Sequence, residues 1–513
     1  MPNAFANPTP LMPDVWALHG KWRGTKPAVE SWDGKLNWAE LIARTNQVGA
    51  GLEGLGLKPG DRAAVLMGNS LSVVEVLVGL MRAGIVAVPL NPAVTDDNVE
   101  AMMRDAGVRA LFLSEEHAGR SFPAELLVEG GLICRSGLVG QDYAAWRDAQ
   151  PATDRGVRVE GHWPCNIIYS SGTTGMPKGI VHTHEQRAVW TYDVAAGLRY
   201  DSSCRTAAVV GLHSNISWVC LLSTFLLGGT LIVEKAFDPA ALFASVRDNG
   251  VSHSCMVPVM VQRLLDAWPE DPSDHAGLKS IMCCGAPLPV GVKAEVLERL
   301  GGVLIELYGS TEGVATTLDP EDAPGRLASV GKPPQGADIL ILDNDDRPLP
   351  AGEAGEIVGR ARFMMDGYWN RPDATAEATW IDSEGRPWLR TGDIGRLDEE
   401  GFLYVVDRKK DMILSGGQNV YPADIEAVLF QHPGVAECAV VGAPSRKWGE
   451  TPVAFVVPAS GAALDAAALC AWANGRVAKF QRLAAVELAA ALPRNATGKV
   501  LKRELRAGLP ERD

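Results

Sequence analysis

The chain has 513 residues, 47% of them hydrophobic, and a formal net charge of −14 with an isoelectric point near 5.2. This length exceeds what one ordinary hydrophobic core organises, so we expect at least two domains. The acidic balance argues against a nucleic-acid scaffold, which usually carries a basic excess. An anionic substrate would therefore need local cations, either Lys and Arg or bound Mg²⁺.

The N-terminal part of the chain alternates helical and strand patterns, which predicts parallel sheets covered by helices. Helical patterns cover residues 38–55, 73–83 and 99–106, and strand patterns cover residues 62–67, 85–88 and 110–113. The first residues carry neither the basic segment nor the apolar core of a signal peptide. The nine cysteines are scattered without a Cys-x-x-Cys pair. These features indicate free thiols in a reducing compartment, and we expect a cytoplasmic protein.

Residues 169–180 carry the strongest functional signal, Tyr-Ser-Ser-Gly-Thr-Thr-Gly-Met-Pro-Lys-Gly-Ile, directly after an apolar strand pattern. Glycines allow a turn to close against a ligand with its N–H groups pointing inward, and hydroxyls beside a lysine suit phosphate oxygens. The segment is not a Walker A loop, because Pro177 precedes Lys178 and Gly179 follows it. An ordinary turn shares this composition, but the ordered string favours a phosphate-binding loop.

Residues 206–233 contain no Asp, Glu, Lys or Arg and are long enough to span a bilayer. Gly228-Gly229 interrupts this stretch before a β-rich run, so we interpret it as a buried helix followed by a buried strand. Helix and strand patterns then alternate again up to residue 300.

The pattern changes near residue 331 to short strands between turns, which predicts a small β-barrel subdomain over residues 331–406. A charged segment follows, and we place a hinge in it at residues 407–410. The hinge separates an N-terminal body (1–406) from a C-terminal domain (411–513) of ordinary size. The predicted fold class is α/β, with two parallel-type, helix-covered sheets and the barrel in the body and a small α+β C-terminal domain.

Six further segments accompany the glycine loop in a fixed order. They are residues 285–287, 308–313, 368–375, 389–395, 407–426 and 493–503. In this order they resemble the adenylate-forming superfamily, which comprises acyl-CoA synthetases, stand-alone adenylation domains and beetle luciferases. The resemblance runs from about residue 38 to residue 503. The sequence from Asp411 to Pro422 is especially similar to that of 4-chlorobenzoate-type CoA ligases.

The resemblance implies a two-step reaction that uses ATP, Mg²⁺ and coenzyme A. A carboxylate attacks the α-phosphate of Mg-ATP to give an acyl-adenylate and pyrophosphate, and a thiol then displaces AMP. Because the first step brings an anion toward a polyanion, positioning and cationic stabilisation must supply most of the catalysis.

The resemblance also implies the residues of the ATP site. The β- and γ-phosphates would lie against Ser170, Ser171, Gly172, Thr173, Thr174, Gly175 and Lys178. Adenine would lie between Tyr308 and the Gly285, Ala286 and Pro287 turn, with Gly309, Ser310 and Thr311 continuing the Tyr308 loop. Asp393 would bind the ribose, Arg408 the ribose or a phosphate, and Thr173, Thr174 and Glu312 the Mg²⁺. Taken alone, Glu312 would be a surface acid and Asp393 a turn cap.

Rotation of a mobile C-terminal domain about Lys410 is implied between the two steps. Lys499 would be the catalytic lysine of adenylation, between the carboxylate and the α-phosphate, whereas Lys502 has no expected role. After rotation, Gly416 and Gly417 would let the pantetheine arm reach the adenylate.

The CoA nucleotide would be held by Trp448, Phe480 and Arg482, with Arg446-Lys447 as a cationic patch for its phosphates. Here the chain departs from its relatives, which often carry Lys-Arg-Pro after the phenylalanine. This chain has Gln481-Arg482-Leu483, followed by Ala484 at a further basic position.

His213 matches an aromatic gate of the acyl pocket, although a satisfied buried histidine is the alternative. The other pocket positions are mainly apolar or small. They are Ser214, Asn215, Trp218, Cys255, Met256, Cys283, Cys284 and Gly309. They contain no Lys or Arg for a second carboxylate, and Asp193 alone could hold a substrate amine. We therefore expect a compact aryl, alicyclic or medium-chain acid.

The sequence predicts an AMP-forming carboxylic acid:CoA ligase. A first alternative is a stand-alone adenylation enzyme that loads a carrier protein, since a carrier presents the same pantetheine arm. A second is a non-catalytic acyl-nucleotide sensor, which the filled catalytic positions disfavour. The sequence leaves the acid and the oligomeric state open.

Overall fold

The computed structural model describes residues 10–512 except 118, 121, 123–131, 136–142, 171–176, 417 and 495–499. Its contacts divide the chain into two compact units. Unit 1 comprises Met1–Asp338 and Gly359–Leu389, and unit 2 comprises Ile339–Val358 and Arg390–Asp513. The α/β class is confirmed, with several sheets and a small C-terminal domain. The domain and hinge boundaries given above stay a prediction.

Unit 1 contains a sheet of order β17-β8-β7-β4-β3-β5-β6, which carries the glycine loop. Its strands are β3 (Arg62–Leu66), β4 (Val86–Pro89), β5 (Ala110–Leu113), β6 (Leu132–Arg135), β7 (Pro164–Ser170), β8 (Lys178–Thr183) and β17 (Gly367–Tyr368). The central strands are parallel, as the alternating pattern predicts, while β8 returns antiparallel beside β7.

A second sheet in unit 1 has the order β14-β13-β12-β11-β9-β10-β1-β2. Its strands are β1 (Pro27–Ser31), β2 (Gly34–Asn37), β9 (Arg205–Ala208), β10 (Thr230–Val233), β11 (His253–Met256), β12 (Ser280–Cys283), β13 (Leu304–Gly309) and β14 (Ala315–Leu318). The strands from β13 to β1 in this order run parallel. Their carboxyl ends therefore meet at one edge, where ligands of such sheets usually bind.

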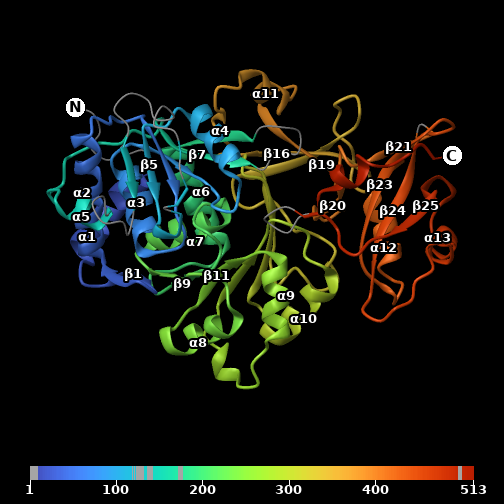
Figure 1. The fold of residues 1–513 in the computed structure, drawn as a ribbon, viewed down its shortest axis with the longest axis horizontal. Helices are drawn as coiled ribbons and strands as arrows, with labels where there is room; N and C mark the ends of the chain where they lie inside the picture. The colour runs from blue at the N-terminus through green and yellow to red at the C-terminus, as the bar shows by residue number, and fades with distance from the viewer. Residues whose placement is uncertain are drawn as a thin grey trace. The chain divides into compact units, whose positions relative to one another are not determined.

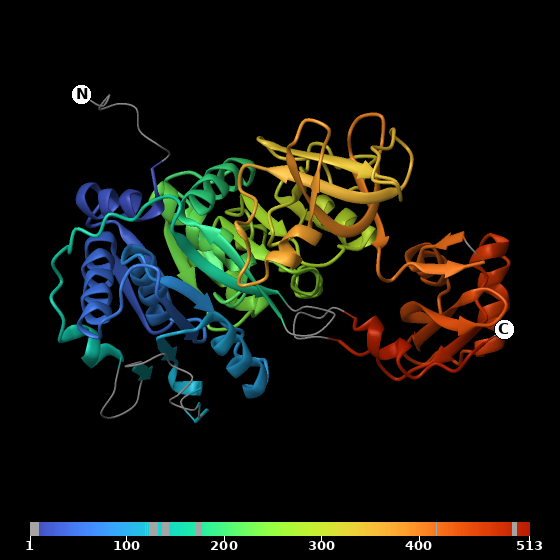
Figure 2. The ribbon, with the colours of Figure 1, turned by 90° about the horizontal axis from the view of Figure 1, so that it is seen from above.

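The helices of unit 1 form layers around the two sheets (Figures 1 and 2). The helices are α1 (Met12–Trp22), α2 (Trp38–Gly54), α3 (Leu71–Arg82), α4 (Asp96–Ala106), α5 (Tyr143–Asp148), α6 (His184–Gly197), α7 (Asn215–Leu227), α8 (Pro239–Asn249), α9 (Pro258–Asp266), α10 (Val290–Leu300) and α11 (Pro372–Glu377), with 3₁₀ turns η1 (Glu115–His117) and η3 (Pro272–Asp274). α4 covers the outer face of the first sheet, and α8, α9 and α10 cover that of the second. α1, α2, α3 and α7 pack in the core between the sheets, and α6 lies against β7, β8 and α7.

The stretch without charges from 206 to 233 forms β9, α7 and β10, whose residues are largely buried, as the sequence predicted. Across the described residues, no helix combines the length and apolar character needed to cross a membrane.

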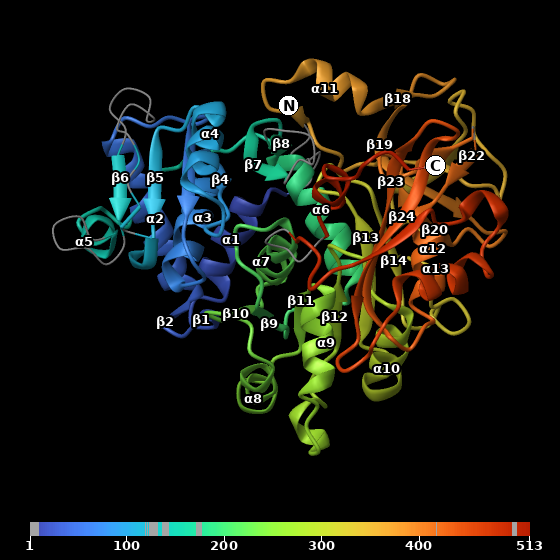
Figure 3. The same ribbon diagram turned by 45° about the vertical axis from the view of Figure 1, so that its right-hand side comes forward.

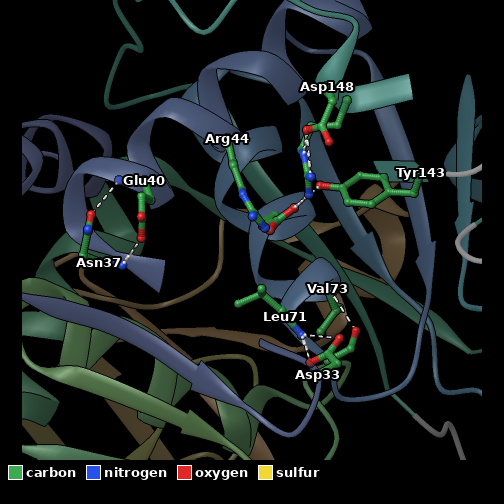
Figure 4. Close-up of polar contacts among 11 residues, drawn as sticks. Asp33, Asn37, Glu40, Arg44, Leu71, Val73, Tyr143 and Asp148 are labelled. Atoms are coloured by element: carbon green, nitrogen blue, oxygen red, sulfur yellow. Dashed lines mark hydrogen bonds and ion pairs between the residues drawn. The ribbon is translucent and has the colours of Figure 1, made fainter. Parts of the chain in front are cut away.

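A buried acid network fixes the helices between the sheets (Figure 4). Glu75 of α3 accepts from Arg44 Nη1 at 2.6 Å, Arg147 Nη1 at 2.5 Å and Tyr143 Oη at 2.9 Å. α2 begins at a capping box in which Asn37 and Glu40 each bind the other's backbone N–H. These charges join α2, α3 and α5 through one fully buried carboxylate, so removing Glu75 would leave the buried Arg147 with the exposed Asp148 but without its buried partner.

The middle of the chain forms a sheet of order β15-β16-β19-β18, with β20 beside β19. Its strands are β15 (Ala337–Leu342), β16 (Gly355–Ala361), β18 (Thr379–Ile381), β19 (Pro387–Leu397) and β20 (Leu403–Arg408). This β-rich segment matches the change of pattern seen near residue 331.

The C-terminal part of unit 2 is a small α+β layer pair (Figure 3). Its sheet has the order β22-β21-β24-β23, with β25 beside β24. The elements are β21 (Ile413–Ser415), β22 (Gln418–Val420), α12 (Pro422–Leu429), β23 (Val435–Ser445), β24 (Gly449–Pro458), α13 (Ala466–Asn474), η4 (Lys479–Gln481), β25 (Ala485–Leu488) and α14 (Lys502–Arg506). α12 and α13 share one apolar core with β23, β24 and β25.

Candidate nucleotide, acyl and thiol sites

The strands on either side of the glycine loop, β7 and β8, are antiparallel partners. Ser170 is the last residue of β7 and pairs with Lys178, the first residue of β8. Of the predicted phosphate-binding residues, Ser171, Gly172, Thr173, Thr174 and Gly175 lie outside the described residues. The two that are described, Ser170 and Lys178, are therefore brought side by side.

Tyr368 brings Lys178 and Glu312 together. Its hydroxyl donates to Glu312 Oε1 at 2.9 Å, and Lys178 Nζ lies 4.8 Å from the centre of its ring. Burial, and next the Glu312 carboxylate, raise the pKa of Tyr368, so the hydroxyl stays a donor. A cation and a carboxylate thus share one aromatic support. The Glu312 carboxylate supplies the hard oxygen that Mg²⁺ prefers, so it fits the metal that accompanies ATP.

The loop that follows β13 is tightly closed. Ser310 N donates to Val314 O at 2.9 Å, and Gly313 N donates to Ser310 O at 3.2 Å. Gly313 has φ 115°, and a Cβ there would lie 2.6 Å from the Cα of Met364, so a larger residue does not fit. The Glu312 carbonyl accepts from Met365 N at 2.8 Å. The loop that carries Ser310, Thr311 and Glu312 therefore has little freedom.

The turn after β12 lies at the same sheet edge. Gly285 has φ 94°, and Gly285, Ala286 and Pro287 are exposed, as an adenine wall requires. Leu288 N donates to Glu306 Oε1 at 3.4 Å, and Glu306 forms a buried ion pair with Lys293. A buried pair thus ties the turn to β13, the strand that carries Tyr308.

A loop between β9 and α7 carries His213 to this edge. Asn69 holds the loop from both sides: its Nδ2 donates to Val210 O at 3.2 Å, and its Oδ1 accepts from Leu212 N at 2.9 Å. A Cβ on Gly211 would lie 2.3 Å from the His213 ring. Burial lowers the pKa of His213 to about 4, so the ring is neutral near pH 7.

The predicted acyl wall is buried and electrically neutral at its core. Trp218, Cys255 and Cys284 are buried in the core between the sheets, and burial raises the pKa of Cys284 to about 12. Met256 and Cys283 are buried instead in the core under α8, α9 and α10, so the structure does not bring these two predicted residues to the wall. Asp193, the candidate amine anchor, is held on both carboxylate oxygens by Arg362. Its charge is therefore already paired.

In unit 2, Asp393 and Arg408 are cross-strand partners on β19 and β20. Arg408 Nε lies 2.7 Å from Asp393 Oδ1. The structure brings the predicted ribose and phosphate residues together as an ion pair, with the carboxylate buried and the guanidinium more exposed. Lys410, the predicted hinge residue, is exposed overall. Partial desolvation of its ammonium group lowers its pKa, while Asp411 acts in the opposite direction.

Gly416 and Trp448 are also adjacent in unit 2. Gly416 N donates to Trp448 O at 2.8 Å, and a Cβ on Gly416, which has φ 58°, would lie 2.9 Å from the indole ring. Lys447 Nζ lies 4.7 Å from the same ring. Phe480 and Arg482 are exposed, and the η4 turn that carries Phe480 contacts β22. Gly417 lies outside the described residues.

Lys499 also lies outside the described residues, but residues before and after it in the chain make defined contacts. Leu501 N donates to Pro493 O at 2.8 Å, and Lys502 Nζ lies 2.7 Å from Glu426 Oε1. Both partners of this ion pair are largely buried, and Glu426 also accepts from Val440 N at 2.7 Å. Lys502, which has no expected role from sequence, is therefore a structural residue.

Models of known families match most of the chain. That of the AMP-binding enzyme matches residues 18–369, and that of the AMP-binding enzyme C-terminal domain matches residues 424–499. The chain belongs to the AMP-binding enzyme family. This membership confirms the assignment to the adenylate-forming superfamily and its acyl-CoA synthetase branch, and with it that the chain is an enzyme.

Relatives of this AMP-binding enzyme differ in their thiol acceptors. A feruloyl-CoA synthase of an Amycolatopsis species is 36% identical, covering 92% of this chain and 93% of its own length. A fatty acid–[acyl-carrier-protein] ligase of Streptomyces coeruleorubidus is 34% identical, covering 96% and 95%. Among solved structures, the o-succinylbenzoate CoA synthetase of Bacillus subtilis in complex with its acyl-adenylate intermediate has a TM-score of 0.85 at 27% identity. It covers 97% of this chain and 99% of that chain.

Sequence reasoning missed several residues of this AMP-binding enzyme that support its loops. Tyr368 stands in a recognised segment, so its contacts with Glu312 and Lys178 could have been suspected. Asn69 and Glu306 carried no signal, because their partners are backbone groups and residues far away in the sequence.

Proposed function

We propose that this AMP-binding enzyme joins a compact, apolar monocarboxylic acid to coenzyme A by way of an acyl-adenylate. The acid is aryl, alicyclic or of medium chain length. The observation that carries the substrate class is the acyl wall: a neutral His213, buried thiols and Trp218 form it, and the charge of Asp193 is paired by Arg362. Such a wall gains free energy from apolar surface, and none of its own residues carries a free charge for a second carboxylate or an amine. Arg187, the cation that contacts Trp218, directs its N–H groups to Asn166 and His182.

In the first step, a carboxylate oxygen attacks the α-phosphorus of MgATP and pyrophosphate leaves. Lys178 and Glu312 are suited to the phosphates and the Mg²⁺, because Tyr368 presents both groups together. Asp393 offers its carboxylate to the ribose hydroxyls, with Arg408 beside it. Lys499 is assigned to the developing charge between the carboxylate and the α-phosphate, on the strength of its motif.

In the second step, the pantetheine thiol attacks the acyl carbon and AMP leaves. Gly416 is suited to line the passage for this arm, because it has no side chain and lies against the exposed Trp448. Rotation of the C-terminal domain about Lys410 would exchange Lys499 for Gly416 at the acyl carbon.

A carrier protein is the alternative acceptor, favoured by the similarity to the acyl-carrier-protein ligase. Coenzyme A is preferred because Lys447 and Trp448 combine a cation with an exposed aromatic face, which suits a phosphorylated nucleotide. The neighbouring Arg446 forms an exposed ion pair with Glu511 at 2.8 Å. The distinguishing measurement is whether free coenzyme A is consumed in step with AMP formation.

The deciding experiment is a CoA-dependent AMP-release assay. The panel would contain benzoates, cinnamates, alicyclic acids, fatty acids of graded length and matched dicarboxylic acids. We expect turnover with one of the apolar monocarboxylic classes and a loss of about 100-fold or more for its dicarboxylic counterpart, because a second charge would be buried without a partner. Preferred turnover of a dicarboxylic acid would contradict the assigned substrate class, and AMP release that ignores coenzyme A would favour a carrier protein.

A further inference from the structure

Arg187 is a fully buried cation with no carboxylate partner among the described residues. It lies in the first turn of α6, and its guanidinium carbon is 4.9 Å from the ring centre of Trp190 and 5.1 Å from that of Trp218. Burial lowers the pKa of Arg187 to about 10, which still leaves it charged at neutral pH. Because a buried charge without a counter-ion is destabilising, packing alone does not account for a guanidinium at this position.

The hydrogen bonds of Arg187 determine the tautomer of His182 on β8. Arg187 Nε donates to Asn166 Oδ1 at 2.7 Å, while Arg187 Nη2 and Asn166 Nδ2 both face His182 Nδ1 at 3.3 Å. Guanidinium and amide N–H groups can only donate, so Nδ1 must be the acceptor and the ring proton must be on Nε2. This Nε2–H donates to the Thr311 carbonyl at 2.9 Å.

The bond from His182 reaches the centre of the loop that carries Glu312. The Thr311–Glu312 pair is then held at three points: His182 binds the Thr311 carbonyl, Met365 N binds the Glu312 carbonyl, and Tyr368 binds the Glu312 carboxylate. The last two contacts come from one segment, residues 365–368. The contact from His182 comes from an earlier part of the chain, because His182 lies on β8 and is itself bound by Arg187 of α6.

We propose that Arg187 is a positioning residue for the adenylation step. By keeping His182 as an Nε2–H donor, Arg187 holds the Thr311 carbonyl and thereby the orientation of Thr311 and Glu312 toward MgATP. This inference rests on the proposed function, in which Glu312 binds the Mg²⁺ of MgATP, and on the predicted place of Thr311 in the loop beside adenine. The thiol step makes no use of the Mg²⁺ and pyrophosphate contacts, so Arg187 affects the two steps unequally.

A charged residue suits this role better than a neutral one. A second proton on His182 would have to sit on Nδ1, facing the N–H groups of Arg187 and Asn166. Burial, and next the Arg187 charge, hold the pKa of His182 well below its usual range. Arg187 of α6 is the charged group that faces this ring, and Cys165 of β7 is the titratable group near Arg187.

The test compares Arg187→Met with Arg82→Met in the full chain. Arg82 is a matched control, because it is also largely buried and bonds neutral groups, Asn46 Oδ1 at 2.7 Å and Pro13 O at 3.4 Å. ATP–pyrophosphate exchange at varied MgATP reports adenylation, and thioester formation from supplied acyl-adenylate reports the second step. Both are measured below the melting temperature of every variant.

We expect Arg187→Met to lower kcat/KM for MgATP in exchange by about tenfold or more, the scale of a lost hydrogen bond to a charged group. Thioester formation should stay within about twofold of the wild type, and Arg82→Met should leave both steps near the wild type. Equal losses in the two steps, or equal effects of the two variants, would overturn the proposal. Absence of exchange in the wild type over the whole acid panel would instead overturn the proposed function.

A second series tests the route through His182. His182→Leu should lose as much adenylation as Arg187→Met, whereas His182→Gln, whose amide can donate to Thr311, should retain most of it. The double variant Arg187→Met/His182→Leu should lose no more than the worse single variant, since residues that act through one path are not additive. Losses that multiply would show that Arg187 acts independently of His182.

Discussion

The 308–313 loop of unit 1 and the Trp448 surface of unit 2 represent opposite ways to build a binding site. The loop is held by backbone bonds, by Gly313 against Met364, and by the side chains of His182 and Tyr368. The Trp448 surface instead presents exposed aromatic and basic side chains, with Phe480 42% and Trp448 45% exposed.

This difference matches the proposed division of chemistry. Charge that develops in a transition state is stabilised best by groups that need no reorganisation, which a tightly held loop provides. The nucleotide part of coenzyme A only has to be bound and does not react. Exposed aromatic and cationic groups are sufficient for this, although each contributes little binding free energy. Substitutions in the loop should therefore change rates, and substitutions on the surface should change mainly the apparent affinity for coenzyme A.

Lys499→Ala is the variant with the largest expected effect. It tests whether Lys499, a residue of unit 2, determines the rate of adenylation. We expect ATP–pyrophosphate exchange to fall by about 1,000-fold, on the scale seen when a key charge-stabilising group is removed, with thioester formation from supplied adenylate retained. Loss of both steps to the same degree would contradict the role. Lys502→Ala is a contrasting variant, since breaking its buried pair with Glu426 should lower thermal stability.

Gly416→Trp tests the second step in the opposite direction. The new side chain meets Trp448 and requires a positive φ, so we expect thioester formation to fall by about 100-fold while exchange persists. Gly461→Trp is the matched control: Gly461 also has a positive φ, 77°, but a Cβ there would meet no described heavy atom within 4 Å. Normal thioester formation by the Gly416 variant would refute the passage.

Tyr368→Phe should have a moderate effect confined to the loop. It removes the bond to Glu312 Oε1 but keeps the ring beneath Lys178, so KM for MgATP should rise about fivefold, the equivalent of about 1 kcal/mol. Tyr143→Phe removes a comparable bond to the buried Glu75 and should lower stability without changing this KM. An unchanged KM in the Tyr368 variant would show that its hydroxyl does not orient Glu312.

The sequence predicted the parallel sheets, the buried α7 and the main site segments, because these depend on local periodicity and on ordered motifs. It did not predict the supports of those segments. Arg187 and His182 stand five residues apart and bond each other, yet Thr311, to which His182 donates, lies more than a hundred residues away, and such contacts are determined by tertiary packing. Lys502 likewise has no expected role from the sequence, because its buried pair with Glu426 joins residues far apart along the chain.

The smallest expected effect concerns His213, whose ring is neutral near pH 7. Burial lowers the pKa of His213 to about 4, so titration of this residue should not change the rate of adenylation between pH 6 and 8. The unfolded chain, with a histidine pKa of about 6.5, binds the proton more readily than the folded one. His213 therefore contributes full stability above about pH 6.5 and loses it progressively as the pH falls toward 4, by at most about 3 kcal/mol. Thermal melting from pH 7 to 4 should consequently be less pH-dependent in His213→Phe than in the wild type, and replacement of the exposed His162 by Gln serves as a control for the loss of an imidazole from the surface. A limb near pH 6.5 in the wild-type rate that disappears in His213→Phe would show instead that this ring titrates as an exposed histidine does.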